Sequence, residues 1–219
     1  GSAGLGSLKL RGRASRMETM MIGLWSMLSM AGAADLVNAE TEDGFEFTVA
    51  LGADIGGQTF SACTGSLITP EVVLTAAHCG SDLPMELVVS LGKAFFGPRI
   101  DVADTVGFSE GIFHPDYVEL QNGIGGTLGQ NDIALLVLEE PVDWVEPVWI
   151  AEDSIADLAV GASVTSIGFG VSSSAGTGSG IKRSAELTVD RIDDTFVYSN
   201  SATNDNSANV CSGDSGGPQ

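Results

Sequence analysis

Short apolar runs separated by turn-forming residues constrain the fold of this chain more than any other feature. Residues 45–51, FEFTVAL, alternate apolar and other side chains, as expected for a half-buried strand. Helical periodicity is absent outside residues 19–34. Many short strands with Gly, Pro, Asp, Asn and Ser between them predict an all-β sandwich or barrel. The further predicted strands are residues 65–69, 72–76, 86–91, 133–138, 163–169, 185–189 and 195–198.

Two stretches between these runs have the composition of loops. Residues 122–129 contain four glycines, and residues 172–180 read SSSAGTGSG. Segments rich in glycine and serine are flexible, so both are expected to be exposed and mobile. The chain has 219 residues, 43% of them hydrophobic, which suits one domain or two small ones.

The first 34 residues have the pattern of a secretory signal peptide. Residues 9–16 are basic, residues 19–34 carry no charge, and the stretch ends in the small residues AGAA. As a helix, the uncharged stretch would span about 24 Å, less than a hydrocarbon core of about 30 Å, so a membrane anchor is the weaker interpretation. A translation start at Met17 would remove the basic region and weaken the export prediction. Export would place residues 35–219 in an oxidising compartment.

Acidic residues dominate the chain, with 29 Asp and Glu against 9 Lys and Arg. Four basic residues and one acid lie in the first 34 positions, so residues 35–219 hold 5 basic and 28 acidic residues, a net charge of −23. Such a surface repels nucleic acids and anionic membranes, and neither is expected as a partner. The simple explanation is a charged shell that keeps a secreted protein soluble, and attraction of cationic substrates toward a cleft is the alternative.

The chain contains three cysteines and two histidines. No pair of cysteines has the CxxC spacing of a structural zinc site, so neither a metal nor another cofactor is expected. An odd number of cysteines leaves one outside any intrachain disulfide.

Three short segments contain residues suited to nucleophilic catalysis: TAAHC at 75–79, NDIAL at 131–135 and GDSGGP at 213–218. Each alone has an ordinary explanation, such as a structural histidine or a turn. Together, in this order, they resemble the chymotrypsin-like serine proteases. The separations, 54 residues from His78 to Asp132 and 83 from Asp132 to Ser215, are similar to those of that family. The resemblance covers residue 36 onward and includes IGFG at 167–170, which is similar to the family's Gly-Trp-Gly segment.

The resemblance implies a particular architecture. It consists of two antiparallel six-stranded β-barrels with the active site between them, His78 and Asp132 on the first and Ser215 on the second. Residues 1–34 would be a leader and residues 35–219 a protease domain that lacks its C-terminal portion. The second barrel would then be incomplete, and residues 185–189 and 195–198 would face open sheet edges. We therefore do not expect these 219 residues alone to form a competent protease.

The resemblance also assigns a role to each member of the catalytic triad. A serine hydroxyl is a weak nucleophile at neutral pH and needs an imidazole to take its proton and return it to the leaving amine. His78 would do both, because histidine changes charge near neutral pH. Asp132 would hold the proton of the other ring nitrogen and stabilise the imidazolium. The backbone N–H groups of Gly213 and Ser215 would form the oxyanion hole.

Activation and specificity depend on other residues that the resemblance implies. Cleavage of a zymogen would free the amine of Leu36 to pair with Asp214. Asp35 precedes Leu36, where the family usually has Arg or Lys, so a trypsin-like activator is not expected. Asn209 would lie at the base of the primary pocket. Because Asn is neutral, we expect no strong preference for Arg or Lys in the substrate.

The cysteines and the second histidine complete the comparison with the family. Cys63 and Cys79 match the disulfide that holds the histidine loop. Cys211 matches a cysteine whose partner lies beyond the catalytic serine. His114 matches a loop before the aspartate segment and is expected to be a surface residue, not a ligand.

These inferences predict a secreted serine endopeptidase that acts on protein or peptide substrates, with protease inhibitors as further partners. The alternative is a non-catalytic protease homologue that serves as a binding protein. Such homologues usually lose His, Asp or Ser, and all three are present here.

Overall fold

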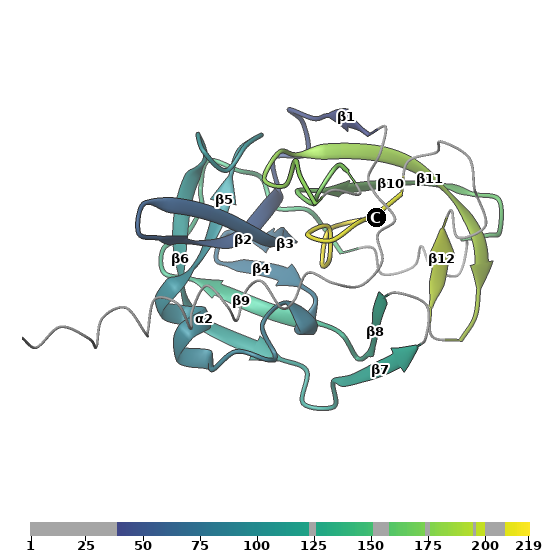
Figure 1. Ribbon diagram of the computed structural model, residues 1–219, viewed down its shortest axis with the longest axis horizontal. Helices are drawn as coiled ribbons and strands as arrows, with labels where there is room; N and C mark the ends of the chain where they lie inside the picture. Colours follow the sequence, from purple (N-terminus) through teal and green to yellow (C-terminus); the bar gives the residue numbers. More distant parts are fainter. Residues whose placement is uncertain (1–38, 123–125, 151–157, 174–175, 195, 200–208) are drawn as a thin grey trace, which may run out of the picture. The chain divides into compact units, whose positions relative to one another are not determined.

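Strands make up nearly all of the regular structure in a computed structural model of the protein (Figure 1). The structure describes residues 39–122, 126–150, 158–173, 176–194, 196–199 and 209–219. The predicted all-β class is confirmed. The predicted leader, residues 1–34, and Leu36 lie outside the described residues.

A closed antiparallel barrel of six strands is the larger structural unit, with the order β2-β3-β4-β9-β6-β5. Alternate side chains point inward and form a dry core that includes Leu67, Val73 and Phe108. Closure leaves no strand edge exposed. The strands are β2 (Thr48–Ile55), β3 (Gln58–Thr69), β4 (Val72–Thr75), β5 (Gly92–Phe96), β6 (Asp104–Phe113) and β9 (Ala134–Leu138).

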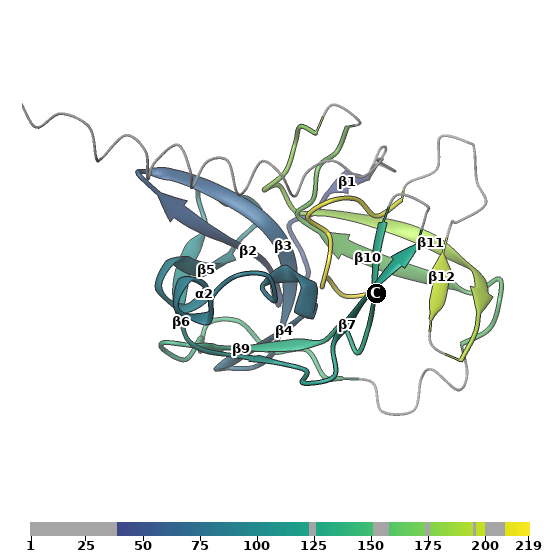
Figure 2. The same cartoon turned by 60° about the horizontal axis from the view of Figure 1, so that its bottom comes forward.

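A four-stranded sheet occupies the place of the expected second barrel (Figure 2). It consists of β1 (Glu40–Thr41), β10 (Ser163–Gly168), β11 (Arg183–Ile192) and β12 (Val197–Ser199). Along β11, β10 pairs with residues 183–188, β1 with residues 183–184, and β12 with residues 189–192. Within the described chain, residues 185–188 therefore have a strand partner on one side only.

The predicted strand at 86–91 is wrong, because these residues form helix α2 (Met85–Leu91). A short apolar run such as MELVVSL has no periodicity that separates strand from helix. Pro84 occupies the N-cap position and cannot donate a ladder hydrogen bond, which favours a helical turn over a strand there. Val88 packs against the barrel core from this helix.

The glycine-rich stretch at 122–129 also departs from its prediction as a loose loop. It contributes to a hairpin of β7 (Val118–Asn122) and β8 (Gly126–Gln130), while residues 123–125 lie outside the described chain. Gly129 is buried in it. The first predicted strand, 45–51, begins only at Thr48, because Phe45 forms a turn with a φ of 49°. The other predicted strands coincide with or overlap β3, β4, β9, β10, β11 and β12.

Candidate active site

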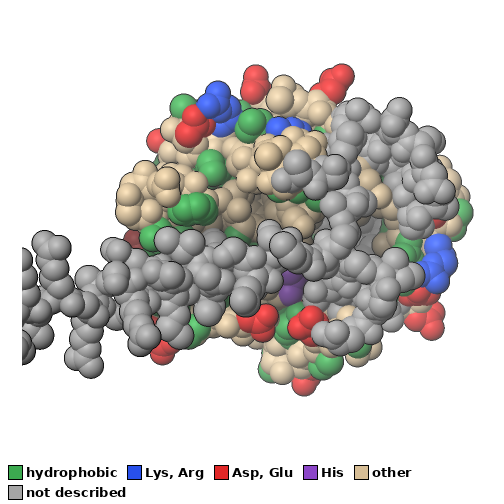
Figure 3. Space-filling model, viewed as in Figure 1, with side chains coloured by type: hydrophobic (Ala, Val, Ile, Leu, Met, Phe, Trp, Pro, Cys, Tyr) green, Lys and Arg blue, Asp and Glu red, His purple; other side chains and the backbone are tan. Residues whose placement is uncertain are grey.

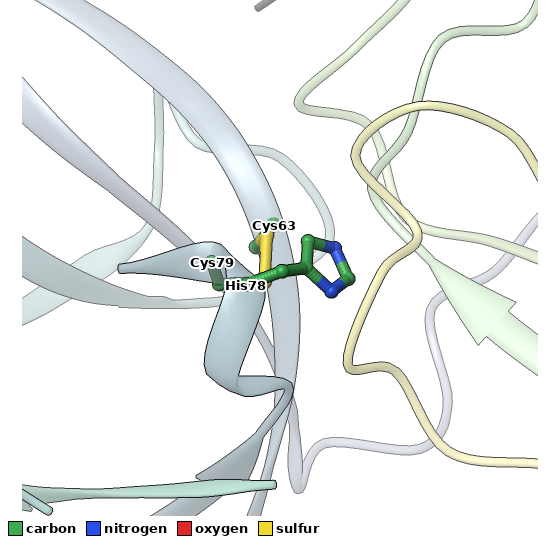
Figure 4. Close-up of side chains that lie close together, drawn as sticks. All are labelled: Cys63, His78 and Cys79. Atoms are coloured by element: carbon green, nitrogen blue, oxygen red, sulfur yellow. A yellow bond between two sulfur atoms is a disulfide. The ribbon is translucent and has the colours of Figure 1, made fainter. Parts of the chain in front are cut away.

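His78 lies in a single turn of 3-10 helix, η1 (Ala77–Cys79), that follows β4 directly. A disulfide joins Cys79 to Cys63 of β3, with 6.1 Å between the two Cα atoms, as the sequence comparison predicted. In Figure 4 the imidazole of His78 points away from the disulfide and toward the C-terminal segment. The barrel and the disulfide together fix the backbone from which this ring projects.

Asp132 accepts two hydrogen bonds from His78. The backbone N–H of His78 donates to Oδ1 over 2.8 Å, and ring atom Nδ1 lies 2.7 Å from Oδ2. An ionised carboxylate only accepts hydrogen bonds, so Nδ1 carries the proton and Nε2 is left as the basic nitrogen. The structure thus brings together two residues that are 54 positions apart in the sequence.

Ser215 belongs to a segment, residues 209–219, that contains no strand. The barrel holds this segment through Thr64, whose N–H donates to the Ser215 carbonyl over 2.9 Å and whose hydroxyl donates to the Gly213 carbonyl over 2.8 Å. The sulfur of Cys79 lies 3.7 Å from the same Ser215 oxygen. This is a contact and not a hydrogen bond, because a disulfide sulfur has no proton. Ser215 therefore lies beside the helix that carries His78.

Glycines shape the turn around Ser215. Gly213 and Gly216 have φ values of 98° and 79°, which disfavour any side chain. A Cβ on Gly216 would lie 2.2 Å from Thr75 Oγ1 and 2.6 Å from the Thr64 carbonyl oxygen. The turn packs so closely on the barrel that only glycine fits. Among the described residues, no group accepts the backbone N–H of Gly213 or Ser215.

Asp214 is a buried carboxylate with 7% of its surface exposed. It accepts N–H bonds from Gly170 and Cys211, each over 2.8 Å. Burial raises the pKa of Asp214 from 3.8 to about 6, and the hydrogen bonds from Cys211 and Gly170 and the charge of Arg183 oppose this only partly. No basic side chain of the described chain forms an ion pair with it. The predicted partner, the amine of Leu36, lies outside the described residues.

The other predicted residues occupy less defined positions. Asn209 is half-buried, and its Oδ1 accepts the N–H of Val210 over 2.9 Å. Cys211 is also half-buried and forms no disulfide among the described residues. His114 is half-buried, and its Nδ1 accepts the N–H of Asp116 over 3.1 Å.

Potential metal-ligand atoms gather at one place in the described chain, where those of Cys63, His78 and Cys79 lie within 4.8 Å of one another. A cysteine binds a metal as its thiolate, and both sulfurs are consumed in the disulfide. His78 alone remains, so these residues do not fit a metal ion in this state.

Nothing in the sequence indicated a role for Lys182, the residue just before β11. Only 1% of its surface is exposed. Its amine donates to the carbonyls of Gly44 and Phe45, over 3.2 and 3.0 Å, and lies 5.7 Å from the ring centroid of Phe169. Burial lowers the pKa of Lys182, and nearby acidic residues, Glu42 first, oppose this. A buried amine needs such partners, because an unpaired one would be costly.

Comparison with known proteins agrees with this geometry. The family model described as Trypsin matches residues 38–219. The chain belongs to the trypsin family. It is 32% identical over 184 positions to "Trypsin" of Saccharopolyspora erythraea, covering 78% of this chain and 74% of that relative. It is 30% identical over 187 positions to "Phenoloxidase-activating factor 1" of Holotrichia diomphalia (72% and 49%), and 29% over 164 positions to "Brachyurin" of Leptuca pugilator (71% and 69%).

Membership of the trypsin family makes this protein a relative of serine proteases. The share of each relative that the alignment covers differs. The alignment spans about three quarters of the bacterial trypsin but about half of the phenoloxidase-activating factor. None of the helices that the structure describes is both long and apolar enough to cross a membrane. On the face in Figure 3, Asp and Glu side chains line much of the margin, while Lys and Arg are few.

Proposed function

We propose that the protein is a secreted serine endopeptidase that cleaves peptide bonds through an acyl-enzyme on Ser215. The observation that carries this proposal is the two-point contact of His78 with Asp132, beside the segment that holds Ser215. The contact leaves Nε2 of His78 as the only ring nitrogen able to accept a proton. Secretion and the signal peptide are part of the proposal, and the disulfide between Cys63 and Cys79 is compatible with them.

The proposed reaction has two halves. In the first, Ser215 Oγ attacks the carbonyl carbon of the substrate while His78 Nε2 takes the hydroxyl proton. The tetrahedral oxyanion would be bound by the N–H groups of Gly213 and Ser215, and the C–N bond breaks as His78 gives its proton to the leaving amine. In the second half, water attacks the ester, His78 takes a proton from it and returns that proton to Ser215 Oγ. Asp132 stabilises the imidazolium in both halves.

Processing would complete the site in a zymogen-like manner. Asp214 is buried and has no ion-pair partner in the described chain, so a cation at this position would be stabilising. The amine of Leu36, once freed by cleavage, is the proposed cation. Its pairing with Asp214 would hold the two turns that present Gly213 and Ser215.

Proteins or peptides are the proposed substrates, and protein inhibitors of proteases are proposed as partners. Asn209, at the proposed base of the primary pocket, is neutral, so we expect a preference for apolar or small residues over Arg and Lys. A cleavage profile from a peptide library tests this expectation. Dominant cleavage after Arg or Lys would contradict it.

A fluorophosphonate probe tests the central proposal. The processed, full-length protein should be labelled, and the Ser215→Ala variant should not. Hydrolysis of casein by the wild type and its loss in the variant would support the same conclusion. A folded, processed protein that neither reacts with the probe nor cleaves casein would favour the alternative, a non-catalytic homologue that binds a partner.

A further inference from the structure

Tyr117 lies at the base of the β7–β8 hairpin, close to Asp132. Its ring packs against Gly129 of β8, since a Cβ on Gly129 would lie 2.6 Å from Tyr117 Cε2. The same Cβ would lie 2.7 Å from Asp132 Cβ and 2.9 Å from Asp132 Cγ. The Cβ position of Gly129 therefore faces both the tyrosine ring and the side chain of Asp132. Any side chain at residue 129 would push the two apart.

The hydroxyl of Tyr117 reaches the loop that carries His78. The side chain of Ser81 lies close enough to the hydroxyl to lower its pKa. Ser81 follows η1 after Gly80, and its N–H donates to the Ala77 carbonyl over 2.9 Å. Tyr117 thus touches the surroundings of both members of the His78–Asp132 pair, through its ring on one side and its hydroxyl on the other.

Backbone bonds fix the hairpin base on both sides of Asp132. The His114 N–H donates to the Ile133 carbonyl over 3.1 Å, and the Tyr117 N–H donates to the His114 carbonyl over 3.1 Å. Asn131 takes a φ of 56° and donates from Nδ2 to the Asp116 carbonyl over 3.0 Å. The turn that presents Asp132 is therefore anchored to the strand before the hairpin as well as to β9.

The charges around the hydroxyl keep it neutral. Burial raises the pKa of Tyr117, and the carboxylates of Asp132, Glu119 and Asp82 raise it further, while the nearby Ser81 side chain opposes them. A neutral phenol adds no second negative charge beside Asp132. The side chain of Asp132 is 18% exposed.

We propose that Tyr117 and Gly129 are positioning residues that hold Asp132 in its two-point contact with His78 and tie that contact to the histidine loop through Ser81. The catalytic consequence of this inference rests on the proposed function. The contact itself does not, so it can be measured in a protein that has lost, or never had, activity.

Three variants test the inference. Gly129→Ala inserts a methyl group between the tyrosine ring and Asp132. A displacement of the carboxylate by about 1 Å can lower the rate up to about 100-fold, and we expect the fall in kcat with KM little changed. Tyr117→Phe and Ser81→Ala each remove one partner of the contact between the hydroxyl and Ser81, and each should lower kcat about 2- to 10-fold. The double variant should be no worse than either single one, because the two residues share that contact.

The Nδ1–H proton of His78 gives a readout that is independent of activity. The chain has only two histidines, and Nδ1 of His114 accepts a hydrogen bond. Selective ¹⁵N-histidine labelling, with His114→Gln for assignment, therefore identifies the His78 resonance. Its proton, bonded to Asp132, should resonate far downfield in the wild type. It should move upfield or exchange faster with water in Gly129→Ala, and less so in Tyr117→Phe.

Tyr198→Phe is the matched control, because Tyr198 is the second of the two tyrosines and lies on β12 against Arg191. It should leave kcat and the His78 resonance unchanged. An unchanged resonance in folded Gly129→Ala and in folded Tyr117→Phe would overturn the inference. If Gly129→Ala does not fold, the tyrosine and serine variants decide alone. A moved resonance in a protein without Ser215-dependent hydrolysis would support the inference and overturn the proposed function.

Discussion

The barrel and the four-stranded sheet are stabilised in different ways. In the part of the chain that the structure describes, thirteen buried side chains form the core cluster of the closed barrel, whereas two, Ala185 and Leu187, form the cluster of the sheet. The barrel carries His78 in the helical turn after β4 and Asp132 just before β9. Ser215 lies on a segment without strands, which hydrogen bonds attach to Thr64 of the barrel and to Ile167 of the sheet. The difference indicates that a packed core positions the base, and that a few bonds and close glycine contacts position the nucleophile.

Asp132→Asn should have the largest effect on the barrel half of the site. Asparagine keeps the shape but would favour the wrong tautomer of His78, so kcat should fall by about 10⁴-fold, a magnitude already established for Ser-His-Asp triads of this family and not computed from this structure. Peptide hydrolysis at saturating substrate measures it. Asp116→Asn, an exposed carboxylate close by, should leave kcat unchanged. Equal losses in both variants would show that Asp132 has no special role.

Gly216→Ala should displace the turn that holds Ser215 and leave the barrel intact. The new methyl group would meet Thr75 and Thr64 of the barrel at distances that demand movement, and the φ of 79° adds backbone strain. Displacing the turn should cost about 10²- to 10³-fold in kcat, as the loss of an oxyanion donor does. Gly176→Ala is the control, because Gly176 also has a positive φ, 72°, but open space around its Cα. A similar loss of activity in both variants would rule out a contact effect.

Truncation of one leucine in each region sharpens the comparison of their cores. Leu67→Ala in the barrel should lower the free energy of unfolding by about 2–5 kcal/mol, because the closed core cannot collapse onto the cavity. Leu187 is also fully buried, but Leu187→Ala should cost less, near the lower end of that range, since its cluster in the described chain contains one other buried side chain, Ala185. Urea denaturation of both variants measures the difference. A larger cost in the sheet would contradict the view that the barrel is the stable unit.

The pH dependence of stability should report the smallest of these effects, at Asp214. Its pKa is raised to about 6 in the folded protein, so the folded state binds the proton more tightly than the unfolded chain. Stability should therefore fall as pH rises from about 4 through 6, by about 3 kcal/mol at most. The difference between wild type and Asp214→Asn, measured by urea denaturation at pH 4 and pH 7, isolates this residue from the other acids. The proposed amine of Leu36 should remove the fall once it is freed, and a processed protein with an unchanged fall would contradict that pairing.

Much of the fold was predictable because strands have a local signature. Short apolar runs bounded by turn-forming residues located β3, β4, β9, β10 and β11. This pattern failed at α2, where a short apolar run after Pro84 forms a helical turn, and at the β7–β8 hairpin, where glycines suggested a loop. Backbone pairing with a neighbouring strand, which no local pattern records, decided the second case.

The site was predictable only through its motifs. The resemblance to a family identified His78, Asp132 and Ser215 as candidates. Periodicity and composition did not predict their contact. Thr64, Tyr117 and Gly129 gave no signal of these roles, because the contacts that define them depend on how the chain folds. Only tertiary contacts reveal such supporting residues.

The burial of Lys182 has a consequence for chemical labelling. The described part of the chain contains two lysines, Lys93 and Lys182, and an amine-reactive reagent would meet them very differently. Lys93 is half-buried on β5, whereas the amine of Lys182 is enclosed and donates to two carbonyls. Acylation of Lys182 therefore requires the turn at Gly44 and Phe45 to detach from β11. Its modification, followed by mass spectrometry against Lys93 as internal reference, would record each opening of that junction.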